Sequence, residues 1–270
     1  MRHVLITGAA GGVGRAIAAA YAEAGDVRLT LADLAPEPRP DLGVPVETLA
    51  VDLADAEQAS GLVDRAWAYA PVDVLVNAAG IYPATPFLEM TAAVWDQVQN
   101  VNVRAAMLTT SAYGRAAGGR GGAVVNITSG AATRARPGAA HYCTSKAALE
   151  MLTKAAAIEL GPQGIRVNAV SPGYVKVDSA ANPVTPEYEA AVSVNPLGRI
   201  GEPSDIGRAV RWITGPDAEW ISGTVLRVDG GASAGTTTLP LHWTGLTPTQ
   251  AGAATAPGGP AHGTNLEGDA

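Results

Sequence analysis

Tyr142 and Lys146 stand four residues apart in the segment YCTSK, and together they could perform acid–base chemistry. On a helix, residues at positions i and i+4 lie on the same face with their side chains close together. An ammonium group beside a phenol favours the phenolate and lowers a tyrosine pKa that is ordinarily about 10. The pair therefore predicts a base that accepts a proton from a hydroxyl group. The alternative, a chance pair on a solvated helix face, stays open until the rest of the chain is considered.

The composition is that of a compact folded protein rather than a disordered one. The chain has 270 residues, of which 47% are hydrophobic and 16% are charged. This length fits one large domain, or one domain with an extension. The formal net charge of −7 argues against broad contact with nucleic acid or with an anionic membrane. We therefore expect a small substrate that is neutral or carried by a cofactor.

Glycines and charged residues interrupt the apolar N-terminal segment 1–25. They are Gly8, Gly11, Gly12, Gly14, Arg15 and Glu23. The uninterrupted apolar run is too short for a signal peptide or a membrane span, and no other stretch qualifies. The sequence predicts a soluble protein of the cytoplasm that is not bound to a membrane.

A single cysteine, Cys143, excludes an internal disulfide framework and any cysteine-cluster metal site. The histidines have neither metal-ligand spacing nor an HExxH pattern, so no metal is expected. They are His3, His141, His242 and His262. We expect His141 at the rim of a pocket or on the surface. Cys143 is expected to be a buried, inert thiol, because no base is evident to activate it.

Short apolar runs alternate with longer helical patterns along most of the chain, and seven of the runs have the length and β-branched content of buried strands. They span residues 3–7, 27–33, 47–53, 72–80, 122–129, 165–173 and 223–231. A helix is predicted between the first two, with an apolar face formed by Val13, Ala16, Ile17, Ala20, Tyr21 and Ala24. This alternation predicts an α/β protein with a doubly wound Rossmann fold and a seven-stranded parallel sheet, because right-handed crossovers leave few other topologies.

Residues 236–270 differ in composition from the rest of the chain, being rich in Thr, Ala, Gly and Pro with only two charged residues. Such a segment forms no core of its own, which favours a flexible C-terminal tail after a folded domain at 1–235. The alternative is an extended arm that docks on this subunit or a neighbour, because Leu239, Leu241 and Trp243 alternate with other residues.

The segment TGAAGGVG, residues 7–14, stands where the first strand gives way to the first helix. Glycines there let a cofactor approach the backbone, and N–H groups at the start of the helix can bind a pyrophosphate. Asp33 ends the second strand, nineteen residues after Gly14, where a carboxylate accepts hydrogen bonds from a ribose and repels a 2′-phosphate. NAD is therefore predicted rather than NADP, since neither Gly11 nor Arg28 offers a site for an extra phosphate. The alternative for Asp33 is a solvated cap or loop carboxylate.

From about His3 to Gly231, the ordered motifs resemble those of the short-chain dehydrogenase/reductase family. The glycine loop is similar to the family's TGxxxGxG. The later motifs, in order along the chain, are VDL (51–53), NAAG (77–80), NVN (100–102), ITS (127–129), YCTSK (142–146), NAVSPG (168–173), NPLGRIGEPSDIGRAV (195–210) and VDGG (228–231). Each motif is modest alone, but their ordered combination is very specific.

The resemblance implies a catalytic tetrad of Asn102, Ser129, Tyr142 and Lys146. Tyr142 would take the hydroxyl proton during alcohol oxidation and return it during ketone reduction. Lys146 would lower the pKa of Tyr142 and bond the nicotinamide ribose. Ser129 would orient the substrate oxygen, and Asn102 would hold a water that links the lysine to solvent. For Ser129 the alternative is a strand-end hydroxyl that bonds local backbone.

The resemblance also implies where the cofactor binds, with Asp52 against the adenine and backbone at Val175 against the carboxamide. The residues expected at the cofactor are Gly8, Gly12, Val13, Gly14, Asp33, Asp52, Leu53, Asn77, Ala79, Gly80, Tyr142, Lys146, Pro172, Gly173 and Val175. One position departs from the family, which commonly has threonine where this chain has Val177. A hydroxyl contact to the cofactor is therefore expected to be missing.

These observations predict an oxidoreductase that transfers a hydride between NAD and a secondary alcohol or ketone. Residues 174–200 are expected to form the substrate lid, and they offer no arginine clamp inside the pocket. A strongly anionic small acid is therefore disfavoured, and we expect a neutral substrate that is moderately hydrophobic or polyol-like.

Two other functions remain open. One is a 3-oxoacyl-thioester reductase of the same family that uses NADPH. The other is a non-catalytic dinucleotide-sensing or scaffold protein that keeps the fold. Because members of the family usually assemble through the helices that bear the tyrosine and lysine, the resemblance implies a homotetramer or a dimer.

Overall fold

The structure is a computed structural model that describes residues 1–177 and 184–235. The C-terminal segment 236–270, expected to be a tail or an arm, lies outside the described residues, as do residues 178–183 of the expected substrate lid. Within the described part of the chain, no helix is long and apolar enough to cross a membrane.

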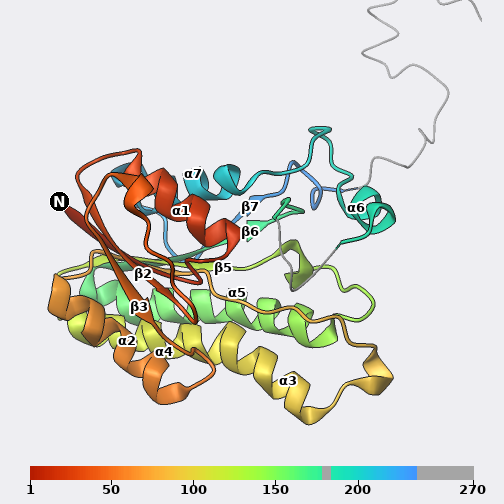
Figure 1. Ribbon diagram of the computed structural model, residues 1–270, viewed down its shortest axis with the longest axis horizontal. Helices are drawn as coiled ribbons and strands as arrows, with labels where there is room; N and C mark the ends of the chain where they lie inside the picture. Colours follow the sequence, from red (N-terminus) through yellow and green to blue (C-terminus); the bar gives the residue numbers. More distant parts are fainter. Residues whose placement is uncertain (178–183, 236–270) are drawn as a thin grey trace, which may run out of the picture. The chain divides into compact units, whose positions relative to one another are not determined.

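Seven parallel strands form one sheet in the order β3-β2-β1-β4-β5-β6-β7 (Figure 1). The strands are β1 (Arg2–Thr7), β2 (Val27–Asp33), β3 (Val46–Ala50), β4 (Val74–Asn77), β5 (Gly122–Ile127), β6 (Ile165–Pro172) and β7 (Val225–Val228). The predicted doubly wound Rossmann fold with a seven-stranded parallel sheet is confirmed.

Helices cover both faces of the sheet. On one face lie α1 (Gly12–Ala22) and α7 (Pro203–Thr214), and on the other lie α2 (Ala56–Tyr69), α4 (Ala105–Ala117) and α5 (Ala140–Leu160) (Figure 1). Helix α3 (Ala92–Gln99) leads through a short π-helix (Asn100–Arg104) into α4. Helix α6 (Pro186–Val192) lies beyond the end of the sheet opposite the N-terminus (Figure 1).

Five predicted strands, at 47–53, 72–80, 122–129, 165–173 and 223–231, extend past the observed carboxyl ends. Strand β3 ends at Ala50, and the Asp52 carboxylate then accepts the N–H of Ala54 at 2.8 Å, which starts the turn toward α2. Strand β4 ends at Asn77, because the next two backbone N–H groups bond to the Thr7 hydroxyl instead of a strand. The residues past these ends are loops that form the site described below.

The strands of the sheet are buried on both faces, as a parallel sheet between two helix layers requires. Val4 and Ile6 pack with α1 and α7, whereas Leu5 packs with α2 and α4. Helix α1 buries Tyr21 as predicted but ends at Ala22, so Ala24, expected on its apolar face, lies outside the helix and is exposed. Each buried aliphatic side chain stabilises the fold by about 1.5–3 kcal/mol, and this core holds the strand ends in place.

The strand order reverses between β1 and β4, where ligands of open α/β sheets bind. The loops that follow these two strands touch at Gly8. Its φ is +66°, and a Cβ atom there would lie 2.6 Å from the Cα of Ala79. Only glycine tolerates both the positive φ and the close contact. Gly8 therefore allows the loops after β1 and β4 to approach each other at this edge.

Candidate active site

The glycine loop leaves the start of α1 open to an anion. A Cβ at Gly14 would lie 2.1 Å from the carbonyl oxygen of Gly8, so the loop folds tightly onto the helix. Gly11 is the N-cap, without a side-chain hydrogen bond, and the first turn holds no acidic residue. Its N–H groups and the positive end of the helix dipole are therefore available to a phosphate. The residues present fit a dinucleotide pyrophosphate at Gly12, Val13 and Gly14.

Val177 lies against this loop. A Cβ built on Gly12 would be 2.7 Å from Cγ1 of Val177, so the chain after β6 passes over the first residue of α1. Val177 is the position where the family commonly has a hydroxyl. Its methyl groups face the glycine loop and supply no hydrogen bond there.

Asp33 holds the glycine loop from the end of β2. Its Oδ2 accepts the backbone N–H of Ala10 at 2.9 Å, and its Oδ1 accepts the N–H of Ala35 at 3.4 Å. Both oxygens lie at the carboxyl edge of the sheet, next to the loop expected to bind the cofactor. The carboxylate therefore stands where a ribose hydroxyl could reach it.

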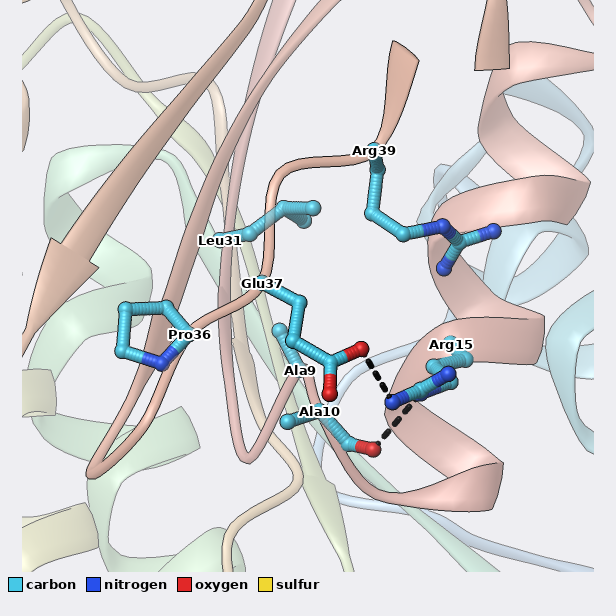
Figure 2. Close-up of a pocket in the computed structure, with 7 residues that line it drawn as sticks. All are labelled: Ala9, Ala10, Arg15, Leu31, Pro36, Glu37 and Arg39. Atoms are coloured by element: carbon cyan, nitrogen blue, oxygen red, sulfur yellow. Dashed lines mark hydrogen bonds and ion pairs between the residues drawn. The ribbon is translucent and has the colours of Figure 1, made fainter. Parts of the chain in front are cut away.

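Two arginines, Arg15 and Arg39, line a pocket beside Asp33. Figure 2 shows this pocket, lined by Ala9, Ala10, Arg15, Leu31, Pro36, Glu37 and Arg39. Arg15 donates to Glu37 at 2.6 Å and to the Ala10 carbonyl at 2.7 Å (Figure 2). Arg39 makes a bidentate pair with Asp41 at 2.9 and 2.8 Å. Each cation has a carboxylate partner, although the buried Nη1 of Arg39 has no hydrogen-bond partner among the described residues.

Arg28 is remote from this pocket. Its guanidinium carbon lies 4.9 Å from the ring centroid of Tyr69, near the start of β2 rather than its carboxyl end. The expectation that Arg28 does not bind a phosphate agrees with this position.

Thr7 and Asn77 brace the strand ends at the switch point. The Thr7 hydroxyl accepts the N–H groups of Ala78 and Ala79 at 3.1 and 3.3 Å. The Asn77 amide donates to Asn126 at 2.9 Å and accepts the Thr109 hydroxyl at 2.8 Å. These bonds to neighbouring elements hold the Asn77 side chain and the end of β4 in place. The backbone of the next residues, 78–80, lies at the carboxyl edge of the sheet.

Asn102 lies in the π-helix that precedes α4. Its Oδ1 accepts the N–H of Ile81 at 2.9 Å, and its Nδ2 donates to the Ile81 carbonyl at 2.9 Å and to the Ser145 hydroxyl at 3.0 Å. One buried amide thus joins the loop after β4 to α5. Such π-helical turns are frequent at functional sites, and this one turns Asn102 toward both partners.

Lys146 is buried on α5, where its ammonium donates to the Ile127 carbonyl at 2.8 Å. A Cβ at Gly80 would lie 3.4 Å from both the Lys146 Nζ and the Asn102 Oδ1, so these side chains face the same space. Burial lowers the pKa of Lys146 to about 8. Among the described residues the ammonium has no acidic partner.

Tyr142 lies one turn before Lys146 on the same face, and the Lys146 Nζ is 5.7 Å from its ring centroid. Burial raises the pKa of Tyr142, while a hydrogen bond with the Ser129 side chain and the charge of Arg136 act in the opposite direction. The expectation that Lys146 brings this pKa below its ordinary value is therefore wrong for the protein described here. Desolvation of the phenol outweighs the favourable neighbours.

Ser129 follows β5 and caps a short 3-10 turn at Gly130–Ala132. Its hydroxyl accepts the N–H of Ala131 at 3.2 Å, which is the local backbone bond considered as an alternative. The Ser129 side chain also acts to lower the pKa of Tyr142, which places it near the phenol. Ser129 can therefore cap the turn and face the substrate oxygen.

An arginine lies at this site, although none was expected inside the pocket from the segment 174–200. Arg136, in the loop between β5 and α5, has its guanidinium carbon 5.5 Å from the ring centroid of Tyr142 and 5.8 Å from that of Tyr188. It also donates to the Tyr188 hydroxyl on α6. The ring of Tyr82 lies 5.7 Å from that of Tyr142. The position of Arg136 in the chain could have indicated this. The loop between β5 and α5 begins at the carboxyl edge of the sheet and ends just before Tyr142, so its side chains are close to the site.

His141 is fully buried, so its expected place at a pocket rim or on the surface is wrong. Its Nδ1 accepts the backbone N–H of Tyr142 at 2.8 Å, and burial lowers its pKa. The ring thereby holds the backbone at the start of α5. Cys143 is buried and unpaired, as expected for an inert thiol.

The remaining expected cofactor residues lie at the same edge. Asp52 and Leu53 follow β3, and Pro172 ends β6. A Cβ at Gly173 would lie 2.7 Å from the Cβ of Asp229, so β6 and the end of β7 approach closely there. Val175 forms a parallel bridge with Gly201. These positions lie at or just after the carboxyl ends of strands, the edge of the sheet that also holds Ser129.

The arrangement combines a helix start that is open to an anion, a carboxylate that bonds the adjoining glycine loop, and a phenol with a hydroxyl and two cations nearby. A phenol so placed can exchange a proton with a substrate oxygen, provided that the oxygen lies within about 3 Å. The Ser129 hydroxyl can hold the same oxygen.

A family profile described as Enoyl-(Acyl carrier protein) reductase matches residues 8–233. The chain is 39% identical over 236 residues to galactitol 2-dehydrogenase (L-tagatose-forming) of Cereibacter sphaeroides, covering 84% of this chain and 92% of that protein. It is 39% identical over 238 residues to L-xylulose reductase of Mesocricetus auratus, covering 85% and 96% respectively.

Solved structures agree with these relatives. A short-chain type dehydrogenase/reductase from Mycobacterium marinum has a TM-score of 0.78 at 31% identity, covering 87% of this chain and 96% of that one. A 4-hydroxyisoleucine dehydrogenase complexed with NADH has a TM-score of 0.77 at 28% identity, covering 87% and 100%. The resemblance stated from the motifs is confirmed: the chain is an oxidoreductase that belongs to the short-chain dehydrogenase/reductase family.

Proposed function

We propose that this oxidoreductase interconverts a secondary alcohol and a ketone with NAD as its cofactor, and that Tyr142 is the general base and acid. The observation that carries this proposal is the burial of Lys146 beside Tyr142. An ammonium that is 4% exposed and has no acidic partner among the described residues lowers the stability of the fold. A role in the reaction explains why a lysine is present at this position in spite of that cost.

In the oxidation direction, the alcohol hydroxyl donates its proton to the Tyr142 oxygen. Ser129 donates a hydrogen bond to the same substrate oxygen and stabilises the charge that develops on it. The Lys146 ammonium places a positive charge 5.7 Å from the centroid of the phenol ring, which offsets part of the cost of ionising the buried phenol. In the reduction direction the phenol returns the proton. When bound, the nicotinamide supplies or accepts the hydride.

Asp33 supports NAD rather than NADP. Its carboxylate stands where the adenosine ribose is expected, and a 2′-phosphate there would meet a like charge. The two nearby arginines, Arg15 and Arg39, are paired with Glu37 and Asp41. The NADH complex of the similar 4-hydroxyisoleucine dehydrogenase agrees with this choice.

A polyol or the corresponding ketose is the proposed substrate class. The names of two relatives, galactitol 2-dehydrogenase and L-xylulose reductase, both refer to such compounds. Hydroxyl groups beside the reacting carbon would meet the hydrogen-bonding phenols of Tyr82 and Tyr188 near Tyr142. The substrate and partner are thus a small neutral molecule, with no nucleic acid or membrane.

The proposed assembly is a homotetramer, or a dimer, built through α4 and α5. Large apolar side chains are exposed on these helices: Met107 is 41% exposed on α4, and Met151 and Ile158 are 62% and 78% exposed on α5. Exposed apolar groups gathered on adjacent helices are typical of a subunit interface. The cytoplasm is the proposed location, because the one cysteine is buried and forms no structural disulfide.

A second candidate is a 3-oxoacyl-thioester reductase that uses NADPH. It is favoured by the 32% identity over 235 residues to a 3-oxoacyl-[acyl-carrier-protein] reductase of Thermotoga maritima, covering 84% of this chain and 96% of that protein. A panel of polyols, ketoses and a 3-oxoacyl thioester, assayed with both NAD and NADP forms at the reduced nicotinamide absorbance, separates the two. We expect turnover of a polyol or ketose with NAD. Activity confined to the thioester with NADPH would replace the proposal by the second candidate.

The Tyr142→Phe variant tests the role of the phenol and also separates the enzyme from a non-catalytic dinucleotide-sensing protein. We expect a loss of kcat of at least about 10²-fold, since general acid–base groups contribute about 10²–10⁴-fold, with NAD affinity retained. Unchanged turnover would remove Tyr142 from the mechanism.

A further inference from the structure

Arg136 lies between the aromatic ring of the proposed base and the helix that borders the site. Its guanidinium is within 6 Å of the ring centroids of Tyr142 and Tyr188 and donates to the Tyr188 hydroxyl. Tyr188 is 52 residues away along the chain. The arginine thus joins the loop before α5, the phenol on α5 and the helix α6.

We propose that Arg136 is a positioning residue of the reaction: its guanidinium orients the Tyr142 ring, favours the ionised phenol, and couples both to α6 through Tyr188. This inference rests on the proposed role of Tyr142 as the base. Stabilisation of the ionised phenol was expected from Lys146 alone. In this proposal Arg136, which lies outside the tetrad, contributes part of it.

The charge of Arg136 is not neutralised by an acid among the described residues, because none of their ion pairs includes it. Guanidinium groups are always protonated at working pH and stack on aromatic rings in this way. Arg136 therefore adds a permanent positive charge next to a phenol whose ionisation burial opposes.

The other groups that face Tyr142 do not cancel that charge. They are Lys146, His141 and Cys143 on α5, Ser129 after β5, Tyr82 in the loop after β4, and Tyr188 on α6. None of these groups is a carboxylate. Helix α6 carries two acids, Glu187 and Glu189, and Glu189 is paired with Lys176 at 3.4 Å.

Lys146 and Arg136 differ in how firmly they hold their charge. Burial lowers the pKa of Lys146 to about 8, and its ammonium already donates to the Ile127 carbonyl. In alkaline solution the lysine becomes neutral, whereas a guanidinium group is in general not deprotonated in proteins. Arg136 therefore keeps a positive charge beside the phenol across the pH range in which Lys146 titrates.

The coupling to α6 has a separate consequence. Tyr188 follows the N-cap of a helix that belongs to the expected substrate lid, and its backbone N–H is capped by Thr185 at 3.2 Å. The bond from Arg136 to its hydroxyl ties that helix to the base. The position of α6 and the orientation of Tyr142 are therefore coupled through Arg136.

The test compares Arg136→Met and Arg136→Lys with Arg134→Met, which removes the same charge from an exposed position of the same loop. The first readout is the pH profile of kcat/KM for alcohol oxidation. Activity rises with pH as the phenol ionises. We expect Arg136→Met to shift this rise to higher pH by about one unit, which lowers kcat/KM about tenfold at a fixed pH below the rise. Arg136→Lys is expected to restore part of the shift, and Arg134→Met to leave the profile unchanged.

The second readout follows the ionisation of Tyr142 directly and requires no turnover. Protein labelled with ¹³C at the tyrosine Cζ is titrated by NMR, and the Tyr142 resonance is the one absent from Tyr142→Phe. We expect its transition to rise by about one unit in Arg136→Met. An unchanged transition in this correctly folded variant would overturn the inference, as would a fall in activity that is equal at every pH.

Tyr188→Phe isolates the link to α6, because it keeps the ring and removes only the acceptor of the Arg136 bond. We expect KM for the substrate to rise several-fold while the pH profile stays in place. A Tyr188→Phe enzyme with unchanged KM would contradict the coupling to α6. If wild type and Arg134→Met both fail to turn over any alcohol, the proposed function fails, and the NMR titration still decides whether Arg136 acts on Tyr142.

Discussion

A methyl group built on Gly12 would lie 2.7 Å from Cγ1 of Val177, so the segment after β6 closes directly over the first residue of α1. We expect Gly12→Ala to lower NAD affinity about tenfold or more, because the methyl group occupies the approach to the helix N–H groups. Stability of the protein alone should change by less than about 1 kcal/mol, since alanine favours the helix while Val177 must shift.

The double variant Gly12→Ala/Val177→Ala separates these two effects. Truncating Val177 should relieve the contact and leave NAD affinity low, as measured by calorimetric titration and thermal unfolding. Full recovery of NAD affinity in the double variant would mean that Gly12 serves only to accommodate Val177.

Asp33 is expected to control the choice between the two nicotinamide cofactors. Asp33→Asn keeps an oxygen for the N–H of Ala10 and removes the charge. We expect the ratio of kcat/KM with NAD to that with NADP to fall about 10–100-fold, because a 2′-phosphate no longer meets a carboxylate. Adding Glu37→Gln, which releases Arg15 from its 2.6 Å ion pair, should lower the ratio further. A ratio that stays constant in both variants would exclude Asp33 as the determinant.

Lys146 is expected to destabilise the protein in return for its role in the site. Burial lowers its pKa from 10.5 to about 8, so between these values the unfolded chain binds more protons than the folded one, and stability rises with pH. Below pH 8 the full cost, about 3 kcal/mol, is present. Lys146→Met should therefore raise the free energy of unfolding at pH 7 by about 1–3 kcal/mol, the lower value allowing for the lost bond to Ile127.

Urea unfolding at pH 7 and pH 10 measures this effect, with Lys154→Met, an exposed lysine on the same helix, as the control. The stabilising effect of Lys146→Met should shrink as pH rises toward 10, and turnover should be lost at every pH. A Lys146→Met protein less stable than wild type at pH 7 would contradict the assigned cost of burial.

Asn102 is expected to stabilise the fold, because its amide joins the loop after β4 to α5. Asn102→Ala removes three hydrogen bonds and leaves the Ile81 N–H and carbonyl without their partner. We expect the free energy of unfolding to fall by about 2–4 kcal/mol in denaturant titrations. Asn100→Ala, a half-buried asparagine of the same π-helix, should cost much less. Equal losses for the two variants would show that the bonds to Ile81 and Ser145 contribute little.

Ile158 tests the proposed assembly. Ile158→Glu puts a charge on a side chain that is 78% exposed on α5, and burying an unpaired carboxylate at a subunit interface is strongly unfavourable. We expect smaller particles in sedimentation experiments. Ala68→Glu, at an exposed position of α2, adds the same charge outside α4 and α5 and should leave the mass unchanged. An Ile158→Glu protein of wild-type mass would exclude this face.

Local patterns were enough to predict the sheet. Seven apolar runs with helices between them leave a parallel sheet as the simple solution, and the glycine loop and Asp33 had to meet because parallel strands end at one edge. The exact ends of strands could not be predicted in this way. Strand β4 ends at Asn77 because its next N–H groups bond to Thr7, seventy-one residues away for Ala78.

The sequence by itself determined the fold, the family and the one-turn spacing that puts Lys146 beside Tyr142, because these follow from periodicities and ordered motifs read within one element or in chain order. Only the tertiary structure decided the surroundings of that pair. Burial of the phenol and of His141, and the approach of Arg136 and Tyr188 from separate segments, depend on how loops pack at the strand edge. Desolvation and contacts between distant segments leave no periodic trace in a sequence, and they govern the pKa of Tyr142.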